Sequence, residues 1–187
     1  MNRSTRTVVS SLVSVTLGLT LGTGAMATTN GSVARVSSAP CRSLWLTPKV
    51  GRMSAAAGTA YITLEIIDHG TFACALTGTP IAQPGFYSYS MQPFVAVGPR
   101  AVRITYPGRG HTILLTPHSV ASVELGISTA GNYPAGQCDP RNISAVELTF
   151  KMRTLSLRLD YPLRTQAVCT KVPSTQIAGV VLGTHFP

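Results

Sequence analysis

The amino-acid sequence predicts an all-β protein built as one antiparallel β-sandwich. Three observations favour this class. Apolar and polar residues alternate with a period of two in several segments, Gly and Pro separate these segments, and no window has the period of an amphipathic helix. The chain has 187 residues, of which 44% are hydrophobic and only 11% are charged. This composition excludes both an intrinsically disordered chain and a coiled coil.

The N-terminal segment has the three parts of a secretory signal peptide. Arg3 and Arg6 supply positive charge, Val8 to Leu21 form an apolar stretch, and small residues follow up to Ala25-Met26-Ala27. The apolar stretch has about 14 residues, fewer than the roughly 20 that a membrane-spanning helix needs. We therefore expect a signal peptide at residues 1–27. The mature chain is expected to have no transmembrane segment and to be extracellular, in the medium or at the cell wall.

The mature chain is expected to begin with a flexible tether and continue as one folded domain. Residues 28–40 are rich in Ser, Thr and Gly and contain few apolar side chains. The domain is expected at residues 41–187, starting at Cys41. A chain of this length can bury about two thirds of its unfolded surface, which is enough for a single core.

Two segments of the domain alternate as half-buried strands do. The even-numbered residues from Ile62 to Ile66 are apolar, and so are the odd-numbered residues from Val123 to Ile127. Successive side chains of a strand point to opposite faces of the sheet, so each apolar set should form one buried face.

A hairpin is expected in the second half of the domain. Apolar residues occupy the even positions from Val146 to Met152 and the odd positions from Leu155 to Tyr161. A two-residue turn at Arg153-Thr154 would place both sets on one face. This register sets Glu147 opposite Asp160, which is unfavourable for like charges, and the turn lacks Gly or Asn. A bulge within one long strand is therefore the alternative.

Gly and Pro mark the remaining turns, and these fall at Gly78-Thr79-Pro80, Gln83-Pro84-Gly85, Gly98-Pro99, Pro107-Gly108-Arg109-Gly110 and Pro134-Ala135-Gly136. Short apolar strands spaced by about 8–15 residues between such turns indicate a sandwich or a barrel. We expect an immunoglobulin-like antiparallel β-sandwich of about 7–9 strands.

Four cysteines agree with export, and they are Cys41, Cys74, Cys138 and Cys169. An even number of cysteines without a C-x-x-C spacing indicates disulfides, and four cysteines allow three pairings. We favour the sequential pairing, Cys41 with Cys74 and Cys138 with Cys169, because each bond then links neighbouring stretches. Each bond would close a loop of about thirty residues and contribute about 3–4 kcal/mol to stability.

Several of these landmarks together resemble a known family. They are Cys41, the strand end Asp68-His69-Gly70, the segment from Cys74 to Pro80, Leu115-Thr116-Pro117, Ser119-Val120-Ala121, Cys138 and Cys169. In this order they resemble domain-of-unknown-function family 4232, which is typical of exported actinobacterial proteins and lipoproteins of mycobacteria and streptomycetes. The resemblance covers about residues 41–181. It implies a β-sandwich, export and sequential disulfides, and it carries over no catalytic residue.

Motifs for catalysis and for metal or cofactor binding are weak. Only six acids are present, and the four His residues have no metal-ligand spacing. The run from Gly126 to Ala130 approaches the G-x-S-x-G hydrolase motif, but Gly131-Asn132-Tyr133-Pro134 follows and cannot start a helix. The Asp68-His69-Gly70 segment is better explained as a turn than as an acid–base pair. We therefore expect no catalytic residue, no cofactor and no metal.

Basic residues are the strongest non-structural feature, because the formal net charge is +9. We expect an anion-binding patch if two groups share one sheet face, with members Arg100, Arg103, Arg109, Lys151, Arg153 and Arg158. The alternative is ordinary solvation of strand faces, with Lys protecting an edge. The expected partners are anionic cell-wall polymers or lipid headgroups, and nucleic acid is not expected because aromatic residues are few.

Two functional hypotheses follow. The first is an exported non-enzymatic module with a binding or structural role at the cell envelope or in the medium. The second is a secreted hydrolase whose active site is built from loops. A β-sandwich can carry either function, and converging titratable groups in one cleft would favour the hydrolase.

Overall fold

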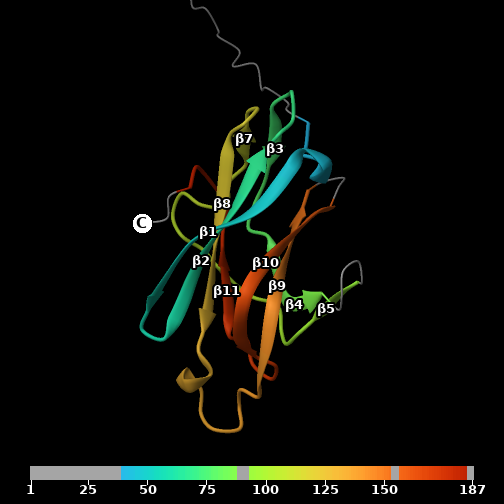
Figure 1. Cartoon of the computed structure of the whole chain (residues 1–187). Coiled ribbons are helices and arrows are strands. Elements are labelled where there is room, and N and C mark those ends of the chain that lie inside the picture. Colours follow the sequence, from blue (N-terminus) through green and yellow to red (C-terminus); the bar gives the residue numbers. More distant parts are fainter. Residues whose placement is uncertain (1–38, 88–92, 153–155, 185–187) are drawn as a thin grey trace, which may run out of the picture. The chain divides into compact units, whose positions relative to one another are not determined.

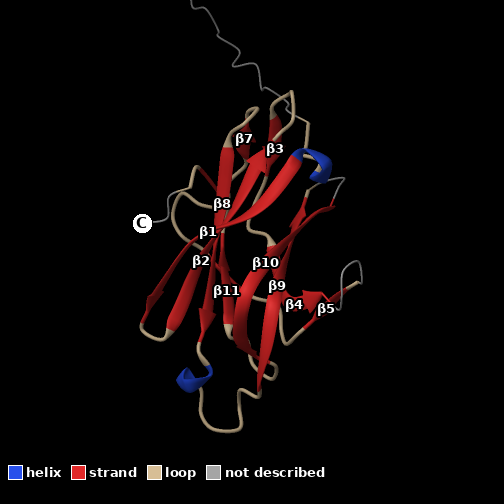
Figure 2. Cartoon of the chain, in the orientation of Figure 1, coloured by secondary structure: helices blue, strands red, loops and turns tan. Residues whose placement is uncertain are grey.

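The described part of the chain is an all-β domain (Figure 1). The structure is a computed structural model, and it describes residues 39–87, 93–152 and 156–184. These residues form strands joined by loops, with two short 3-10 helices at Ser43–Trp45 (η1) and Ala130–Asn132 (η2) (Figure 2). The predicted signal peptide and residues 28–38 of the predicted tether lie outside the described residues. Ala39 and Pro40, at the end of that tether, already pair with Ala75.

One layer is a six-stranded sheet. Its strands follow the order β1 (Leu46–Ala56), β2 (Thr59–Asp68), β8 (Val120–Ser128), β11 (Thr175–Ala178) and β6 (Val102–Ile104). The sixth strand, β12 (Val181–Leu182), pairs with β8. The pair β11–β6 is parallel, so the expectation of a wholly antiparallel sandwich is wrong for this edge. Between β6 and β11 the chain passes through β7, β8, β9 and β10, so β11 can return beside β6 in the same direction.

The other layer is a four-stranded sheet in the order β10 (Ser156–Cys169), β9 (Pro140–Lys151), β4 (Ile81–Tyr87) and β5 (Phe94–Ala96). A separate pair joins β3 (Cys74–Leu76) to β7 (Ile113–Leu115). The described residues thus contain twelve strands, more than the 7–9 expected from the sequence. The difference comes from pieces of two to four residues, which are too short to show alternation. The all-β class is confirmed, and the immunoglobulin-like topology stays a prediction.

The predicted hairpin is confirmed by the pairing of β9 with β10. Glu147 lies opposite Asp160, and Lys151 lies opposite Ser156. This is the register that a turn at Arg153-Thr154 requires, although the turn itself lies outside the described residues. Because β9 and β10 are antiparallel partners, the alternative of one long bulged strand is wrong.

The core lies between the two main sheets. The alternating residues expected to be buried, from Ile62 to Ile66 in β2 and from Val123 to Ile127 in β8, are at most 3% exposed. From the opposite sheet come Val146, Leu148 and Phe150, all fully buried. The sequence periodicity therefore identified the inner face of both sheets.

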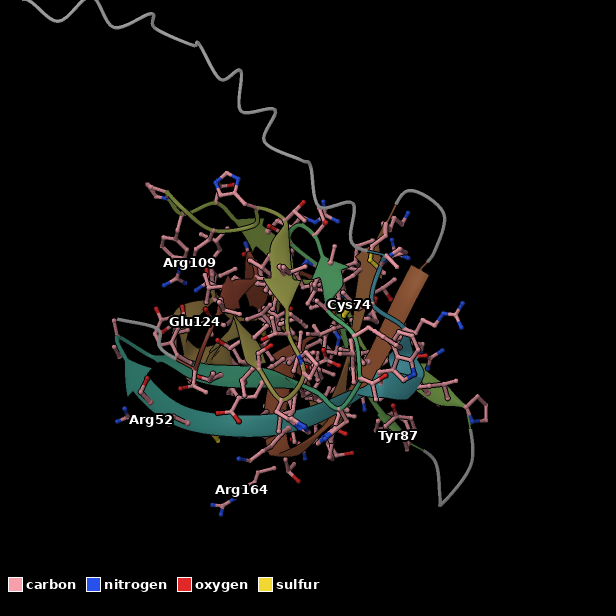
Figure 3. The ribbon with its side chains drawn as sticks, turned by 90° about the horizontal axis from the view of Figure 1, so that it is seen from above. Arg52, Cys74, Tyr87, Arg109, Glu124 and Arg164 are labelled. Atoms are coloured by element: carbon pink, nitrogen blue, oxygen red, sulfur yellow. A yellow bond between two sulfur atoms is a disulfide. The ribbon has the colours of Figure 1, made fainter. Side chains whose placement is uncertain are left out.

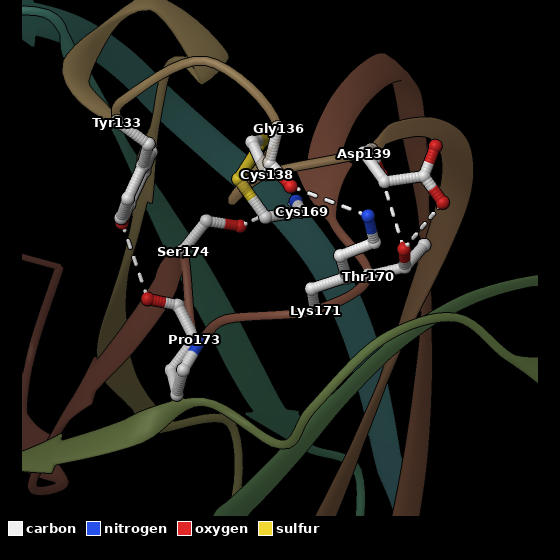
Figure 4. Close-up of a disulfide and its surroundings, with 9 residues drawn as sticks. All are labelled: Tyr133, Gly136, Cys138, Asp139, Cys169, Thr170, Lys171, Pro173 and Ser174. Carbon is white, nitrogen blue, oxygen red and sulfur yellow. Dashed lines mark hydrogen bonds between the residues drawn. A yellow bond between two sulfur atoms is a disulfide. The ribbon is translucent and has the colours of Figure 1, made fainter.

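The two disulfides pair as expected, Cys41 with Cys74 and Cys138 with Cys169. They fix opposite ends of the domain, because β3 starts at the first bond and β10 ends at the second (Figure 1). Hydrogen bonds surround the disulfide between Cys138 and Cys169 (Figure 4). The Cys169 amide donates to Ser174 Oγ at 2.8 Å, and Thr170 Oγ1 donates to Asp139 Oδ2 at 3.0 Å. Within the residues described, no helix is long and apolar enough to cross a membrane.

Candidate functional site

A groove opens at the side of the sandwich, between the edge strands of the two sheets. Both β1 and β10 are terminal strands in their sheets. The groove has a volume of about 460 Å³, and its lining consists of Val50, Gly51, Met53, Ile62, Pro162, Leu163 and Arg164. Apart from Gly51 and Arg164 these residues are apolar, so the groove is an apolar cleft with a cation at its side. We call it the lateral groove.

The lateral groove exists because both edge strands lose their register at the same place. In β1 the pairing shifts between Val50 and Met53, and in β10 it shifts between Pro162 and Gln166. A bulge leaves extra residues unpaired and bends the strand locally. The irregular segments of both strands line the groove together with Ile62 of the core, which is only 1% exposed.

Each of the two unpaired segments carries one arginine. Arg52 belongs to the bulge of β1 and Arg164 to that of β10, and both project from the domain (Figure 3). Neither forms an ion pair with another residue in the described parts of the chain. Glu65 lies close to Gly51 of the lining, and its carboxylate is paired with Lys49 at 3.4 Å. The mouth of the groove therefore carries unbalanced positive charge.

A second cluster of polar groups lies on the outer face of the four-stranded sheet. Arg158 in β10 contacts both members of the like-charged pair, with Nη2 at 2.7 Å from Glu147 Oε2 and Nε at 3.4 Å from Asp160 Oδ1. The guanidinium contacts both carboxylates and offsets the repulsion between them. Burial lowers the pKa of Arg158, but the charges of Asp160 and Glu147 outweigh this effect and raise it. Burial, followed by hydrogen bonding to Asp160, raises the pKa of the Tyr87 phenol.

The predicted basic residues do not come together on one sheet. Arg103 lies in β6 of the six-stranded sheet and Arg100 in the loop before it, whereas Lys151 and Arg158 lie in β9 and β10 of the other sheet. Arg153 lies outside the described residues. Arg109 and Tyr87, a neighbour of Arg158, lie on opposite sides of the domain (Figure 3). The condition for a single basic patch is therefore not met, and Arg158 is held by two acids.

Arg109 forms a separate small site. Its guanidinium lies 4.7 Å from the centre of the Tyr106 ring, a cation–π contact. A shallow hollow of about 320 Å³ is lined by Tyr106, Pro107, Arg109 and Glu124. Glu124 comes from the middle of β8, so this hollow brings together residues that are distant in the sequence.

The two weak catalytic motifs have structural roles. Oδ1 of Asp68 accepts a hydrogen bond of 2.8 Å from the Gly70 amide, the turn geometry that the sequence favoured. Its other oxygen lies 4.0 Å from Sγ of Cys74, which is in a disulfide and has no proton to donate. Ser128 ends β8, and its hydroxyl shares a hydrogen bond of 3.2 Å with that of Thr59.

Comparison with known proteins gives no identification. No family model, no curated protein and no solved structure matches the chain. The resemblance to domain-of-unknown-function family 4232 therefore stays a prediction. In the described ranges, no group of three or more His, Cys, Asp or Glu residues is placed to hold a metal ion.

Sequence reasoning missed the lateral groove and its two arginines. Arg52 and Arg164 lie 112 residues apart in the sequence. The alternation of apolar and polar residues does not show that their two strands are edge strands on the same side of the sandwich. One signal was present: Pro162 follows Tyr161 directly, and a proline within a strand indicates an edge or a bulge.

Proposed function

We propose that this protein is an exported, non-enzymatic module that binds an anionic component of the cell envelope. One observation carries the proposal: exposed arginines without an ion-pair partner in the described parts of the chain, namely Arg42, Arg52, Arg100, Arg103, Arg141 and Arg164. Unpaired surface cations on a basic protein attract phosphate and carboxylate groups. The full chain has a net charge of +9, and loss of residues 1–27, which contain Arg3 and Arg6, would leave +7. Envelope polymers and lipid headgroups present such groups.

Export is part of the proposal, and two disulfides support it. Disulfides persist in oxidising compartments and are rare in the cytosol. The signal-peptide pattern at residues 1–27 supplies the route. N-terminal sequencing of protein from the culture medium should find Thr28 as the first residue, and exported protein that keeps residues 1–20 would contradict the proposal. Membership in family 4232 is proposed on the landmark residues given above.

The alternative hydrolase would find its best titratable groups at Glu147, Asp160 and Tyr87. In this cluster Arg158 occupies both carboxylates, at 2.7 and 3.4 Å. This arrangement explains how a like-charged register is stabilised, and neither carboxylate lines the lateral groove or the hollow beside Arg109. We therefore favour the binding module.

Sedimentation with vesicles tests the proposed function. The protein should bind phosphatidylglycerol vesicles at about 10 mM salt and be released at about 150 mM, because screening shortens the Debye length from about 30 to about 8 Å. Neutral phosphatidylcholine vesicles should not bind it. Isolated cell-wall material should show the same salt dependence. Binding that ignores both salt and lipid charge would overturn the proposal.

Paired charge reversals then locate the binding surface. Arg52→Glu with Arg164→Glu alters the lateral groove, whereas Arg100→Glu with Arg103→Glu alters the β6 edge by the same charge. Arg158→Glu is unsuitable, because it would place a third acid beside Glu147 and Asp160. At least one of the two double variants should weaken vesicle binding at low salt. Wild-type binding by both would mean that these arginines are ordinary solvated residues.

A further inference from the structure

The lateral groove combines an apolar cleft with a cationic mouth, which is the combination that a charged amphiphile requires. We propose that it binds one acyl chain of an anionic lipid, with the anionic headgroup held by Arg164 and Arg52. This inference rests on the proposed function and deepens it, because it names the ligand class and the place where it binds.

The lining fits a hydrocarbon chain. Val50, Met53 and Ile62 come from the inner side of the six-stranded sheet, and Pro162 and Leu163 from the edge of the other sheet. Exposure falls from 46% at Met53 to 1% at Ile62, so the cleft leads from the surface toward the core. A volume of about 460 Å³ lies within the range of small-molecule sites, which are mostly apolar with a few placed polar groups.

The charges at the mouth specify an anionic headgroup. Arg164 lines the groove, and Arg52 lies between two lining residues, Gly51 and Met53. Both are exposed and have no ion-pair partner in the described chain, while Glu65 is neutralised by Lys49. Arginine offers a planar fork of donors that matches phosphate and carboxylate oxygens. An anionic headgroup therefore gains charge-assisted hydrogen bonds that a neutral or cationic one lacks.

The edges of the groove disfavour an extended peptide as the occupant. A peptide that extends a sheet needs a regular edge with free N–H and C=O groups. Here both edges are bulged, and Pro162 has no amide hydrogen to donate. An acidic peptide still carries the complementary charge, so it is the competing occupant that the experiment must distinguish from a lipid.

Titration with dodecyl phosphate below its micelle concentration tests the inference. The probe is added to the protein with both disulfides formed, and amide chemical shifts are followed by NMR. We expect saturable binding of one molecule, with shifts centred on Val50 to Met53 and on Leu163 and Arg164. Inorganic phosphate lacks the hydrocarbon chain and dodecyltrimethylammonium lacks the anionic headgroup. Each should therefore bind at least about tenfold more weakly than dodecyl phosphate. Saturable binding of a hexaglutamate peptide to the same residues would overturn the lipid assignment.

Variants show whether the groove itself carries the binding. Arg164→Glu and Met53→Gln should each weaken dodecyl phosphate binding by about tenfold or more. Arg141→Glu is the matched control, since it reverses an exposed charge on β9 outside the groove lining and should bind as the wild type does. Thermal unfolding of each variant establishes that it is folded. Equal binding by Arg164→Glu and Arg141→Glu would overturn the inference.

The experiments distinguish a failure of the lipid inference from a failure of the proposed function. If wild-type protein sediments with phosphatidylglycerol vesicles but shows no saturable dodecyl phosphate site, the inference fails and the proposed function stands. If the protein ignores vesicles and cell-wall material at low salt, the proposed function fails whatever the groove binds.

Discussion

The hydroxyl of Tyr161 donates a hydrogen bond of 2.9 Å to the backbone carbonyl of Glu65. Tyr161 belongs to β10 of the four-stranded sheet and Glu65 to β2 of the six-stranded sheet, so the bond crosses the sandwich. The Tyr161 side chain is fully buried. It directly precedes Pro162, which lines the lateral groove, and its hydrogen bond therefore links the two sheets beside the groove.

Replacing Tyr161 with Phe should destabilise the domain. The substitution keeps the ring in the core but leaves the Glu65 carbonyl without its donor, which costs about 1–2 kcal/mol. Urea unfolding measures the loss. Tyr61→Phe is the control, because the Tyr61 hydroxyl has no hydrogen bond in the described structure and its removal should change stability by less than about 0.5 kcal/mol. Equal stability of the two variants would contradict this role.

The same residue should make stability depend on alkaline pH. Burial, and to a smaller degree the charge of Glu65, raises the pKa of the Tyr161 phenol above its ordinary value of 10.0. Above that value the unfolded chain releases a proton that the folded protein retains. The free energy of unfolding should therefore fall as pH rises past about 10, by up to about 1.4 kcal/mol per pH unit. In Tyr161→Phe this contribution is absent, so parallel pH profiles for the two proteins would refute the assignment.

Removing Arg158 should expose the repulsion between its two acids. Arg158→Ala is expected to cost about 1 kcal/mol at neutral pH, a modest value because the side chain is half exposed. Adding Asp160→Asn to Arg158→Ala should restore most of the stability at neutral pH. Lys151→Ala should have little effect, because Lys151, on the same strand pair, forms no ion pair with any residue that the structure describes.

The sequence predicted the hairpin and its register because alternation over seven or more residues determines which face is buried. It also predicted the disulfide pairing, from loops that join neighbouring stretches. It did not predict β3, β5, β6, β7, β11 or β12, since two to four residues cannot show a period. The candidate site escaped prediction for a related reason. Arg52 and Arg164 are brought to one groove by the order of strands in two sheets, and that order depends on long-range packing rather than on local pattern.

Loss of either disulfide should lower the free energy of unfolding, and the two losses should be similar in size. The bonds span 33 and 31 residues, and loops of this length contribute about 3–4 kcal/mol in the chain-entropy model. Cys41→Ser with Cys74→Ser, and Cys138→Ser with Cys169→Ser, should each lower the free energy of unfolding by this amount in urea. Non-reducing peptide mapping of the wild type should recover the two sequential pairs. A fragment that links Cys41 to Cys169 would contradict the pairing.

The turn between β1 and β2 offers a stabilising substitution. Ala57 and Gly58 both have positive φ, at 46° and 72°, which is the geometry of a two-residue type I′ turn. An alanine in the left-handed region costs about 1 kcal/mol, whereas Asn tolerates it. Ala57 is exposed, so the larger side chain meets no obstacle. Ala57→Asn should therefore raise the free energy of unfolding by about 0.5–1 kcal/mol, visible as a rise of a few degrees in Tm.

At Gly58, the second residue of this turn, we expect a substitution to destabilise the domain. A Cβ atom at Gly58 would lie 2.6 Å from Oδ1 of Asn132, whose Nδ2 donates to the Gly58 carbonyl at 3.0 Å. Gly58→Ala should therefore destabilise the domain, through backbone strain and through displacement of Asn132. Ala56→Asn, which places Asn in the strand itself, should bring no gain, because Asn is disfavoured in strands. If Ala56→Asn and Ala57→Asn raised Tm equally, the turn geometry would not be the cause.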